Sequence, residues 1–354
     1  MKNKTRNIFF LFGLAAVVVM LFTFKVSFVT LWHDILKAGY WLFAIFALWV
    51  VLYAMNAWSW RVIIRGSGSC PVPFWKLYKV TVTGFALNYA TPAGLMGGEP
   101  YKVMELKPYL GVQRATSSVL LFAMMHIFAH FWFWLLSVVL FIVFMPVNSV
   151  LTIVLSLITL FCVIGIFFFI KGYRKGMVVK VIRMIGHLPG LKKWAARFME
   201  KNHENLVKID EQIAALQGHN KKSFYGAFFL ELVGRFGQCL EIYFMLKMFS
   251  DDDRMFLHAI FILAFTSLFA NLLFFLPLQI GGREGGFTMS TASLHLSGEV
   301  GMFISIICRV RELFWTFLGL MLMKVGNDSP ESAEQEEETR NVDAPDEKTE
   351  NPES

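Results

Sequence analysis

Two short segments of this 354-residue chain share one pattern of residues that could bind an anion. Each has an asparagine, then a proline, then two adjacent glycines, then a glutamate seven residues beyond the proline. The residues are Asn88, Pro92, Gly97, Gly98 and Glu99 in the first segment and Asn271, Pro277, Gly281, Gly282 and Glu284 in the second. Proline removes a backbone donor and interrupts a helix, and paired glycines permit turns and close backbone approach. The pattern therefore predicts two broken helices.

The apolar surroundings of both segments decide what such a break can do. In lipid, a freed N–H or C=O group is costly unless protein or a wet cavity satisfies it. Broken backbone at membrane depth therefore predicts a polar cavity, and a helix that begins after each glycine pair would point its positive end into it. Paired broken helices in two halves of a chain are typical of transporters. The alternative, loops at the membrane surface whose glycines serve packing, stays open.

Charged residues inside neighbouring apolar stretches favour the cavity. Glu231 and Arg235 share one helix face with Gln238, and Arg309 lies inside the last apolar stretch, followed by Arg311 and Glu312. Ionised groups at such depth normally face a partner or water. A structural Arg–Glu lock is the alternative.

Two histidines, His126 and His130, also share a helix face, without the glutamate of a zinc-protease motif. Packing or interhelical hydrogen bonding is the interpretation that we favour for them. The four cysteines are scattered, and the sequence has neither a nucleotide-binding loop nor a Ser–His–Asp pattern. We expect no cofactor, no metal site and no nucleotide-driven step.

The composition explains which elements must position these residues. The chain is 56% hydrophobic with a mean hydropathy of +0.55, more than a soluble domain can bury. A span needs about 20 apolar residues. The candidates are 7–24, 40–61, 116–145, 150–170, 223–248, 256–278 and 300–323. We predict an all-α, polytopic membrane helix bundle of about seven to eight spans, with two broken or re-entrant segments in an inverted-repeat-like arrangement.

Charge divides the chain and orients it. The basic N-terminus is expected in the cytoplasm, on the inner membrane of a bacterium, and its first apolar stretch is expected to stay as a membrane helix. Residues 171–222 hold 12 basic and 4 acidic residues and predict a cytoplasmic connector. Part of it, 194–216, has amphipathic spacing, which suits either the membrane surface or a solvated connector helix.

The C-terminal residues 326–354 differ from the rest of the chain. They are acidic and almost without apolar side chains, so we predict a disordered tail after a membrane domain that covers 1–325. The tail lies in the cytoplasm if 285–296 crosses the membrane and outside if that stretch only dips in. The cytoplasmic side is favoured, with weak support from Lys324.

At these motifs the sequence resembles the lysylphosphatidylglycerol synthase transmembrane family, the flippase-like domain. The matching residues run from Thr91 to Pro100 and from Pro277 to Gly285, with Arg309 in the last span, and the resemblance covers about 5–325. In this family the multiple peptide resistance factor uses such a domain to flip an aminoacylated phospholipid, and a separate soluble domain transfers the lysine. That soluble domain is not found here, so the resemblance implies translocation rather than synthesis. Gln279 and Ile280 differ from the usual glycine-rich run, which leaves the cargo open.

The function that we expect is translocation of a lipid with a phosphate headgroup. Such a lipid is a phospholipid, an aminoacyl-phospholipid or a polyprenyl-phosphate-linked lipid, and it would move downhill or with an ion gradient. Backbone donors at the four paired glycines would hold the phosphate, Arg283 and Arg309 would supply positive charge, and Glu99 and Glu284 would contact amines or hydroxyls. Asn88, Thr91, Pro92, Asn271, Pro277, Glu231 and Arg235 complete the candidate binding residues.

Two other functions stay open. One is a transferase with a polyprenyl-phosphate donor, which would use acidic outer loops at Asp34 and 251–253. The other is a scaffold that holds lipid or envelope-biosynthesis enzymes through 171–222 or the tail. The expected partners are anionic membrane lipids and no nucleic acid, and a homo-oligomer stays open.

Overall fold

The fold is known from a computed structural model, which describes residues 28–90, 98–175, 178–185, 220–249, 252–273 and 282–324, and isolated residues within 7–11 and 197–214. All regular structure in these residues is helical, which confirms the predicted all-α class. Five candidate residues, Thr91, Pro92, Gly97, Pro277 and Gly281, lie outside the described residues. The tail 326–354 and nearly all of the first predicted span lie outside them too.

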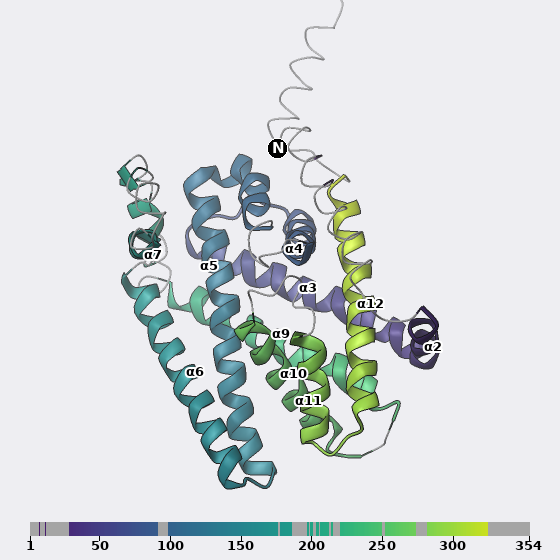
Figure 1. Cartoon of the computed structure of the whole chain (residues 1–354). Coiled ribbons are helices and arrows are strands. Elements are labelled where there is room, and N and C mark those ends of the chain that lie inside the picture. The colour runs from purple at the N-terminus through teal and green to yellow at the C-terminus, as the bar shows by residue number, and fades with distance from the viewer. Residues whose placement is uncertain are drawn as a thin grey trace, which may run out of the picture.

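Figure 1 shows the described helices in their order along the chain. They are α2 (Phe28–Ala38), α3 (Tyr40–Gly66), α4 (Phe74–Ala90), α5 (Gly98–Phe144), α6 (Ser149–Lys175), α7 (Val178–Ile185), α9 (Lys221–Leu246), α10 (Met255–Leu272), α11 (Gly282–Ser293) and α12 (Gly298–Leu322). In Figure 1, α5 and α6 form an antiparallel hairpin at one side of the molecule, and α12 runs along the other side.

Four of the described helices are long and apolar enough to cross a membrane: α3, α5, α10, and α6 as far as Lys171. They correspond to four of the predicted spans. The helices α9 and α12, with 26 and 25 residues, have the length of a span but carry buried charges in their middle. The chain is therefore a multi-pass membrane protein, and α9 and α12 turn their charged side chains towards the protein interior.

The helix α5 starts earlier than the apolar run from 116 predicts. Its backbone leaves helical geometry at Gly111, where φ is +74°, and Pro108 precedes that break. Proline and a glycine with positive φ are both expected at a kink. The apolar pattern therefore predicts only the part after the kink, and the earlier part begins directly at the first glycine pair.

The helix α11 is too short to cross a bilayer alone. Its 12 residues extend about 18 Å at 1.5 Å each, against about 30 Å of hydrocarbon. A turn that contains His295, with φ of 59°, connects it to α12. The cytoplasmic placement of the tail requires that 285–296 crosses the membrane. The length of α11 does not support such a crossing.

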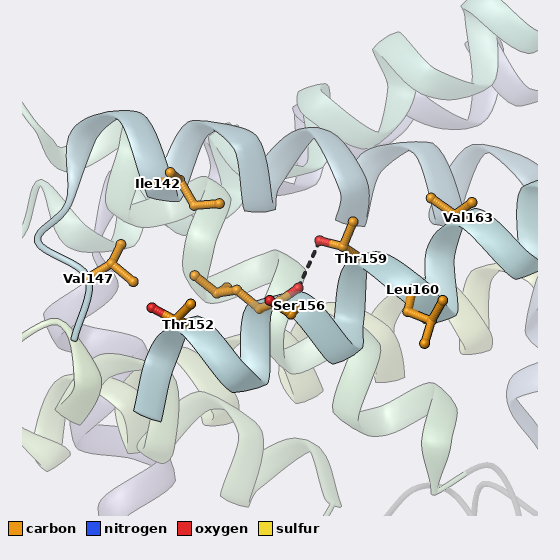
Figure 2. A pocket seen from close by; sticks show the side chains of 8 residues that line it. Ile142, Val147, Thr152, Ser156, Thr159, Leu160 and Val163 are labelled. Carbon is orange, nitrogen blue, oxygen red and sulfur yellow. Dashed lines mark hydrogen bonds between the residues drawn. The ribbon is translucent and has the colours of Figure 1, made fainter. Parts of the chain in front are cut away.

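The helix α6 exposes most of its apolar side chains, as a helix in contact with lipid does. Between it and α5 lies an open apolar groove of about 530 Å³, lined by Ile142, Val147, Thr152, Leu155, Ser156, Thr159, Leu160 and Val163 (Figure 2). The Thr159 hydroxyl donates to the Leu155 carbonyl at 2.8 Å, so its polarity is satisfied within the helix. The groove contains no charged group.

The predicted amphipathic stretch 194–216 packs on protein at the two apolar positions that are described as buried. Leu206 and Ile209 are 6% and 7% exposed, and Ile209 belongs to the core around Trp60 and Phe122. At these positions the apolar face contacts protein.

Candidate functional site

The last turn of α4 places two neighbouring side chains in two different polar clusters. Asn88 contacts the start of α5, and Tyr89 contacts α12. Consecutive residues of a helix point about 100° apart, so one turn reaches both neighbours. The pair stands directly before the first proline–glycine segment.

The first cluster, the Lys102 cluster, consists of Asn88, Glu99 and Lys102. Asn88 Oδ1 accepts a hydrogen bond from the Gly98 backbone N–H at 2.8 Å, and its Nδ2 donates to Glu99 Oε1 at 3.0 Å. Lys102 Nζ lies 3.3 Å from the same carboxylate oxygen. The Lys102 side chain is only 2% exposed and packs over the ring of Phe85, with Nζ 4.8 Å from the ring centroid.

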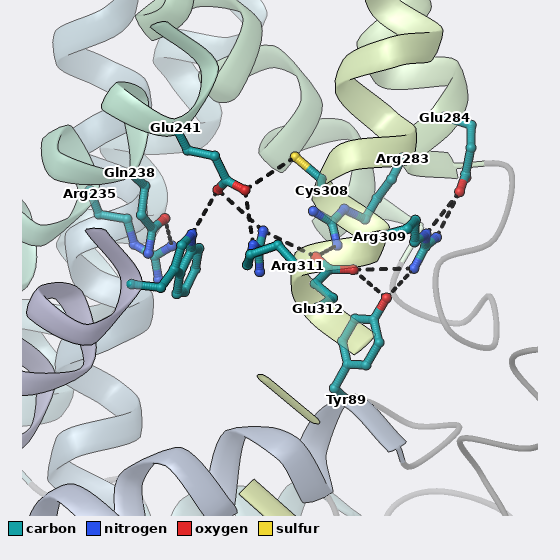
Figure 3. A network of polar contacts seen from close by, with 11 residues as sticks. Tyr89, Arg235, Gln238, Glu241, Arg283, Glu284, Cys308, Arg309, Arg311 and Glu312 are labelled. Atoms are coloured by element: carbon teal, nitrogen blue, oxygen red, sulfur yellow. Dashed lines mark hydrogen bonds and ion pairs between the residues drawn. The ribbon is translucent and has the colours of Figure 1, made fainter. Parts of the chain in front are cut away.

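The second cluster, the arginine cluster, gathers three cations and three anions from three helices (Figure 3). Its members are Arg283 and Glu284 of α11, Arg309, Arg311 and Glu312 of α12, Glu241 of α9, and the Tyr89 hydroxyl of α4. Three arginines against three glutamates give formal neutrality, which lowers the cost of burying charge in a membrane protein.

Arg309 is the centre of this arrangement. Its Nε and Nη2 donate to Glu284 Oε1 at 3.0 and 2.9 Å, and its Nη1 lies 3.6 Å from Glu312 Oε2. Nη1 also donates to the Tyr89 hydroxyl, which in turn donates to Glu312. Arg283 forms an ion pair with the other oxygen of Glu312. Tyr89 therefore brings the end of the first segment's helix to the residues of the second segment.

Arg311 holds α12 to α9 and α3. Its Nε and Nη2 donate to the two oxygens of Glu241 at 2.9 and 3.3 Å, and its guanidinium lies 4.0 Å from the ring centroid of Trp49. Trp49 Nε1 donates to Glu241 Oε2 at 3.0 Å. Both partners are buried, and their two parallel hydrogen bonds are the strong geometry for arginine and carboxylate.

Exposure differs within the arginine cluster. The Glu284 side chain is 26% exposed and Arg283 is 18% exposed, whereas Arg309 and Glu312 are 4% and 7% exposed. Glu284 is thus the member that a ligand from outside meets first, and Arg309 lies behind it.

A third group, the histidine cluster, joins α5 to α9 and consists of His126, His130, Glu231 and Arg235. His126 Nδ1 lies 2.8 Å from Glu231 Oε2, and Arg235 donates from Nη2 to His126 Nε2 and from Nη1 to Gln238 at 3.0 Å. His130 stacks one turn from His126, with ring centroids 5.4 Å apart. The predicted interhelical hydrogen bond of these histidines is confirmed for His126.

The structure distributes the described candidates over three clusters and leaves Asn271 apart. Glu284, Arg283 and Arg309 meet in one cluster, and Gly98 and Gly282 begin α5 and α11, so a helix starts at each glycine pair. Asn271 is exposed and donates to the Ser267 carbonyl of its own helix at 2.7 Å. The two asparagines of the shared pattern thus have different roles.

Several site residues escaped the sequence interpretation. Tyr89 and Lys102 stand beside the first motif, but an aromatic and a lysine near a membrane normally mark its interface. Glu241 and Trp49 lie in stretches without a motif. The one sequence signal for Glu241 as a site residue is that it is a charged residue inside an apolar run. Their contacts join residues far apart in the chain.

Comparison with known proteins gives one match, and it is to a family. The model of the lysylphosphatidylglycerol synthase TM region matches residues 10–319. No curated protein and no solved structure matches the chain.

Proposed function

Because this chain belongs to the lysylphosphatidylglycerol synthase TM region family, we propose that it moves a lipid with a phosphate headgroup across the membrane. In this proposal the protein is a translocator of the bacterial inner membrane, with its N-terminus in the cytoplasm, and no enzyme. The lipid is a phospholipid, an aminoacyl-phospholipid or a polyprenyl-phosphate-linked lipid.

The observation that carries the proposal is the arginine cluster. Tyr89 comes from the helix before the first glycine segment, and Arg283 and Glu284 come from the helix after the second. They meet on Arg309 and Glu312 of α12, a helix with the length of a membrane span. Charges at that depth are costly and mark substrate pathways in membrane proteins. The helices α5 and α11, which start at the glycine pairs, add donor-rich N-termini.

The exchange of one anion for another is the step that this geometry supports. Arg309 donates two hydrogen bonds to one oxygen of Glu284, the most exposed carboxylate of the cluster. A phosphate offers the same charge-assisted acceptor and can replace Glu284 on Arg309. Released Glu284, together with Glu99 of the Lys102 cluster, would then contact amines or hydroxyls of the headgroup.

The re-entrant arrangement belongs to this proposal. The helix α11 is shorter than a bilayer, and α12 follows it after a tight turn. If α11 enters and leaves on one side, the headgroup meets Arg283 and Glu284 partway across the membrane. A headgroup there is screened from lipid tails by α11 and by α10 and α12, which both pack on α11.

The test is lipid movement in reconstituted vesicles. The assay follows fluorescent phosphatidylglycerol from one leaflet to the other for wild type, Arg309→Gln, and the Glu99→Ala, Arg283→Ala double variant. Loss of hydrogen bonds to a charged group is worth about 1.5–3 kcal/mol, so we expect roughly tenfold slower movement or more. Arg254→Gln, at an exposed arginine before α10, is the matched control and should move lipid at the wild-type rate.

The result that overturns the proposal is equal lipid movement by wild type and both site variants when all elute as folded protein. Turnover of a polyprenyl-phosphate sugar by purified protein would instead favour the transferase.

A further inference from the structure

The histidine cluster contains a buried carboxylate that the exchange at Arg309 does not use. Glu231 is 3% exposed on α9, and the groups that face it come from three helices. These groups are His126 and Lys102 on α5, Arg235 on α9 and the Ser59 hydroxyl on α3, and His130 packs against His126.

The hydrogen bonds of His126 fix where its proton lies. A guanidinium only donates, so His126 Nε2, which receives a hydrogen bond from Arg235, must carry the lone pair. The imidazole proton is then on Nδ1, which donates to Glu231 Oε2 at 2.8 Å. This arrangement has a neutral histidine between an ionised glutamate and a charged arginine.

Glu231 differs from the other buried carboxylates of the described part of the chain. Glu105, Glu241 and Glu312 each have a lysine or arginine nitrogen within 4.0 Å. The partner of Glu231 at that distance is the imidazole of His126, through which Arg235 is connected. A proton can therefore bind to Glu231 without breaking a direct ion pair between a carboxylate and a permanent cation.

Two atoms of the cluster have capacity for a proton. Glu231 Oε1 and His130 Nε2 are buried, and neither has a hydrogen-bond partner among the described residues. The Ser59 hydroxyl, which donates to the Ala227 carbonyl at 3.3 Å, is close enough to turn towards Glu231. An acceptor oxygen, a free ring nitrogen and a rotating hydroxyl are the parts of a proton relay in a membrane protein.

We propose that Glu231 is a proton-binding site that couples movement of the anionic lipid to movement of a proton in the same direction. The inference rests on the proposed function and names its driving ion. The proton adds to Oε1, where it forms an O–H bond and converts the carboxylate to the neutral acid. It then leaves Oε1 towards the opposite side of the membrane.

Charge balance links the proton to the lipid. Glu99 and Glu231 together offset Lys102 and Arg235, and the arginine cluster is neutral as well. An entering phosphate adds one negative charge to this interior, and a proton on Glu231 removes one. Protonated Glu231 also holds His126 less strongly, because its Oε2 then accepts the Nδ1–H bond as part of a neutral acid, and this favours contact of Arg235 with the anion. Glu231 and Glu241 stand on the same helix, so α9 connects the two clusters.

The experiment measures protons and lipid in the same vesicles. Wild type, Glu231→Gln and Glu231→Asp are reconstituted with fluorescent phosphatidylglycerol and a trapped pH dye, and the membrane potential is held at zero. Ser137→Ala is the matched control on α5, because its hydroxyl contacts only the Phe133 carbonyl of the same helix, at 2.7 Å.

In wild type and in Ser137→Ala, a pH gradient should speed lipid movement at least fivefold, and proton uptake should rise with the amount of lipid moved. Glu231→Gln, which mimics the protonated acid, should move lipid at a rate independent of the gradient and take up no protons. Glu231→Asp keeps a carboxylate and should keep the coupling. If Glu231→Gln does not fold, coupling that persists in Glu231→Asp with a shifted pH midpoint of proton uptake would support the site.

Three results would overturn the inference. The first is a rate of lipid movement in wild type that does not depend on the pH gradient. The second is proton uptake that persists in Glu231→Gln. The third applies if Glu231→Gln does not fold, and it is full coupling in Glu231→Asp with an unchanged pH midpoint of proton uptake. The first leaves the lipid function standing. Absence of lipid movement in wild type at every gradient would overturn the proposed function and the proton site together.

Discussion

Asn88 and Glu99 join the two sides of the first glycine segment. The Asn88 amide donates to the Glu99 carboxylate at 3.0 Å, and its Oδ1 accepts from the backbone of Gly98 at 2.8 Å. One buried side chain thus connects the end of α4 to the start of α5. Asn271, the corresponding residue before the second segment, donates instead to the Ser267 carbonyl of its own helix.

Replacement of Asn88 by alanine should destabilise the protein and slow lipid movement. It leaves the buried Gly98 N–H without its acceptor, which costs about 1–3 kcal/mol, and removes one of the two donors to Glu99 Oε1, so that Lys102 stays as the other. Thermal unfolding in detergent measures the loss. Asn271→Ala is the control, since its amide bonds only its own helix. Equal effects of the two substitutions would contradict the clamp.

Tyr89→Phe removes one hydroxyl and keeps the ring. The hydroxyl lies between Arg309 and Glu312, so its loss should weaken the contact of α4 with α12 by about 1.5–3 kcal/mol. We expect a normal elution profile, a lower unfolding temperature and altered lipid movement. Tyr225→Phe, at an exposed tyrosine of α9, should change none of these. Identical behaviour of both variants would show that the hydroxyl is not a link.

Glu284→Gln and Arg309→Gln should change lipid binding in opposite directions. Glutamine at 284 leaves Arg309 with one carboxylate fewer, so phosphate competes better for it. A change of about 1.4 kcal/mol in the binding free energy changes the dissociation constant of phosphatidylglycerol tenfold. Titration of the detergent-solubilised protein measures both constants. A decrease in both variants would contradict the exchange of Glu284 for a headgroup.

The interface between α11 and α12 depends on the absence of a side chain at Gly301. A Cβ there would lie 2.5 Å from Thr291 Oγ1 and 2.8 Å from Thr288 Cα. Gly301→Ala should therefore destabilise the protein by about 1–3 kcal/mol. Gly285→Ala on α11 meets nothing within 4 Å and should be neutral or slightly stabilising, because alanine favours helix. Thermal unfolding measures the stability of the two variants. Equal stabilities would contradict the close packing of α11 on α12 at Gly301.

Removal of Glu241 alone should be far more harmful than removal of its whole ion pair. Glu241→Met leaves Arg311 buried beside Trp49 with only Glu312, 3.5 Å away, and should cost about 3–5 kcal/mol. The Glu241→Met, Arg311→Met double variant keeps the arginine cluster neutral and should recover most of that loss. Glu299→Gln, at an exposed position of α12, is the control. A double variant as unstable as the single one would contradict this account.

The sequence predicted the elements well where apolar runs were unbroken. The spans at α3, α6 and α10 follow directly from runs of apolar residues, and Arg309 was identified because an arginine inside such a run needs a partner. The partners themselves could not be derived, since Arg311 meets Glu241 only through the packing of α12 on α9, 70 residues away in the chain. Lys102 shows the same limit, because nothing local distinguishes a buried lysine from an interfacial one.

The adjacency of Asn88 and Tyr89 has a mechanical consequence. Both sit on one rigid helical turn, so a rotation of that turn that withdraws Tyr89 from α12 also pulls Asn88 away from α5. The contact of α4 with α12 and its contact with the start of α5 therefore break together and not one after the other.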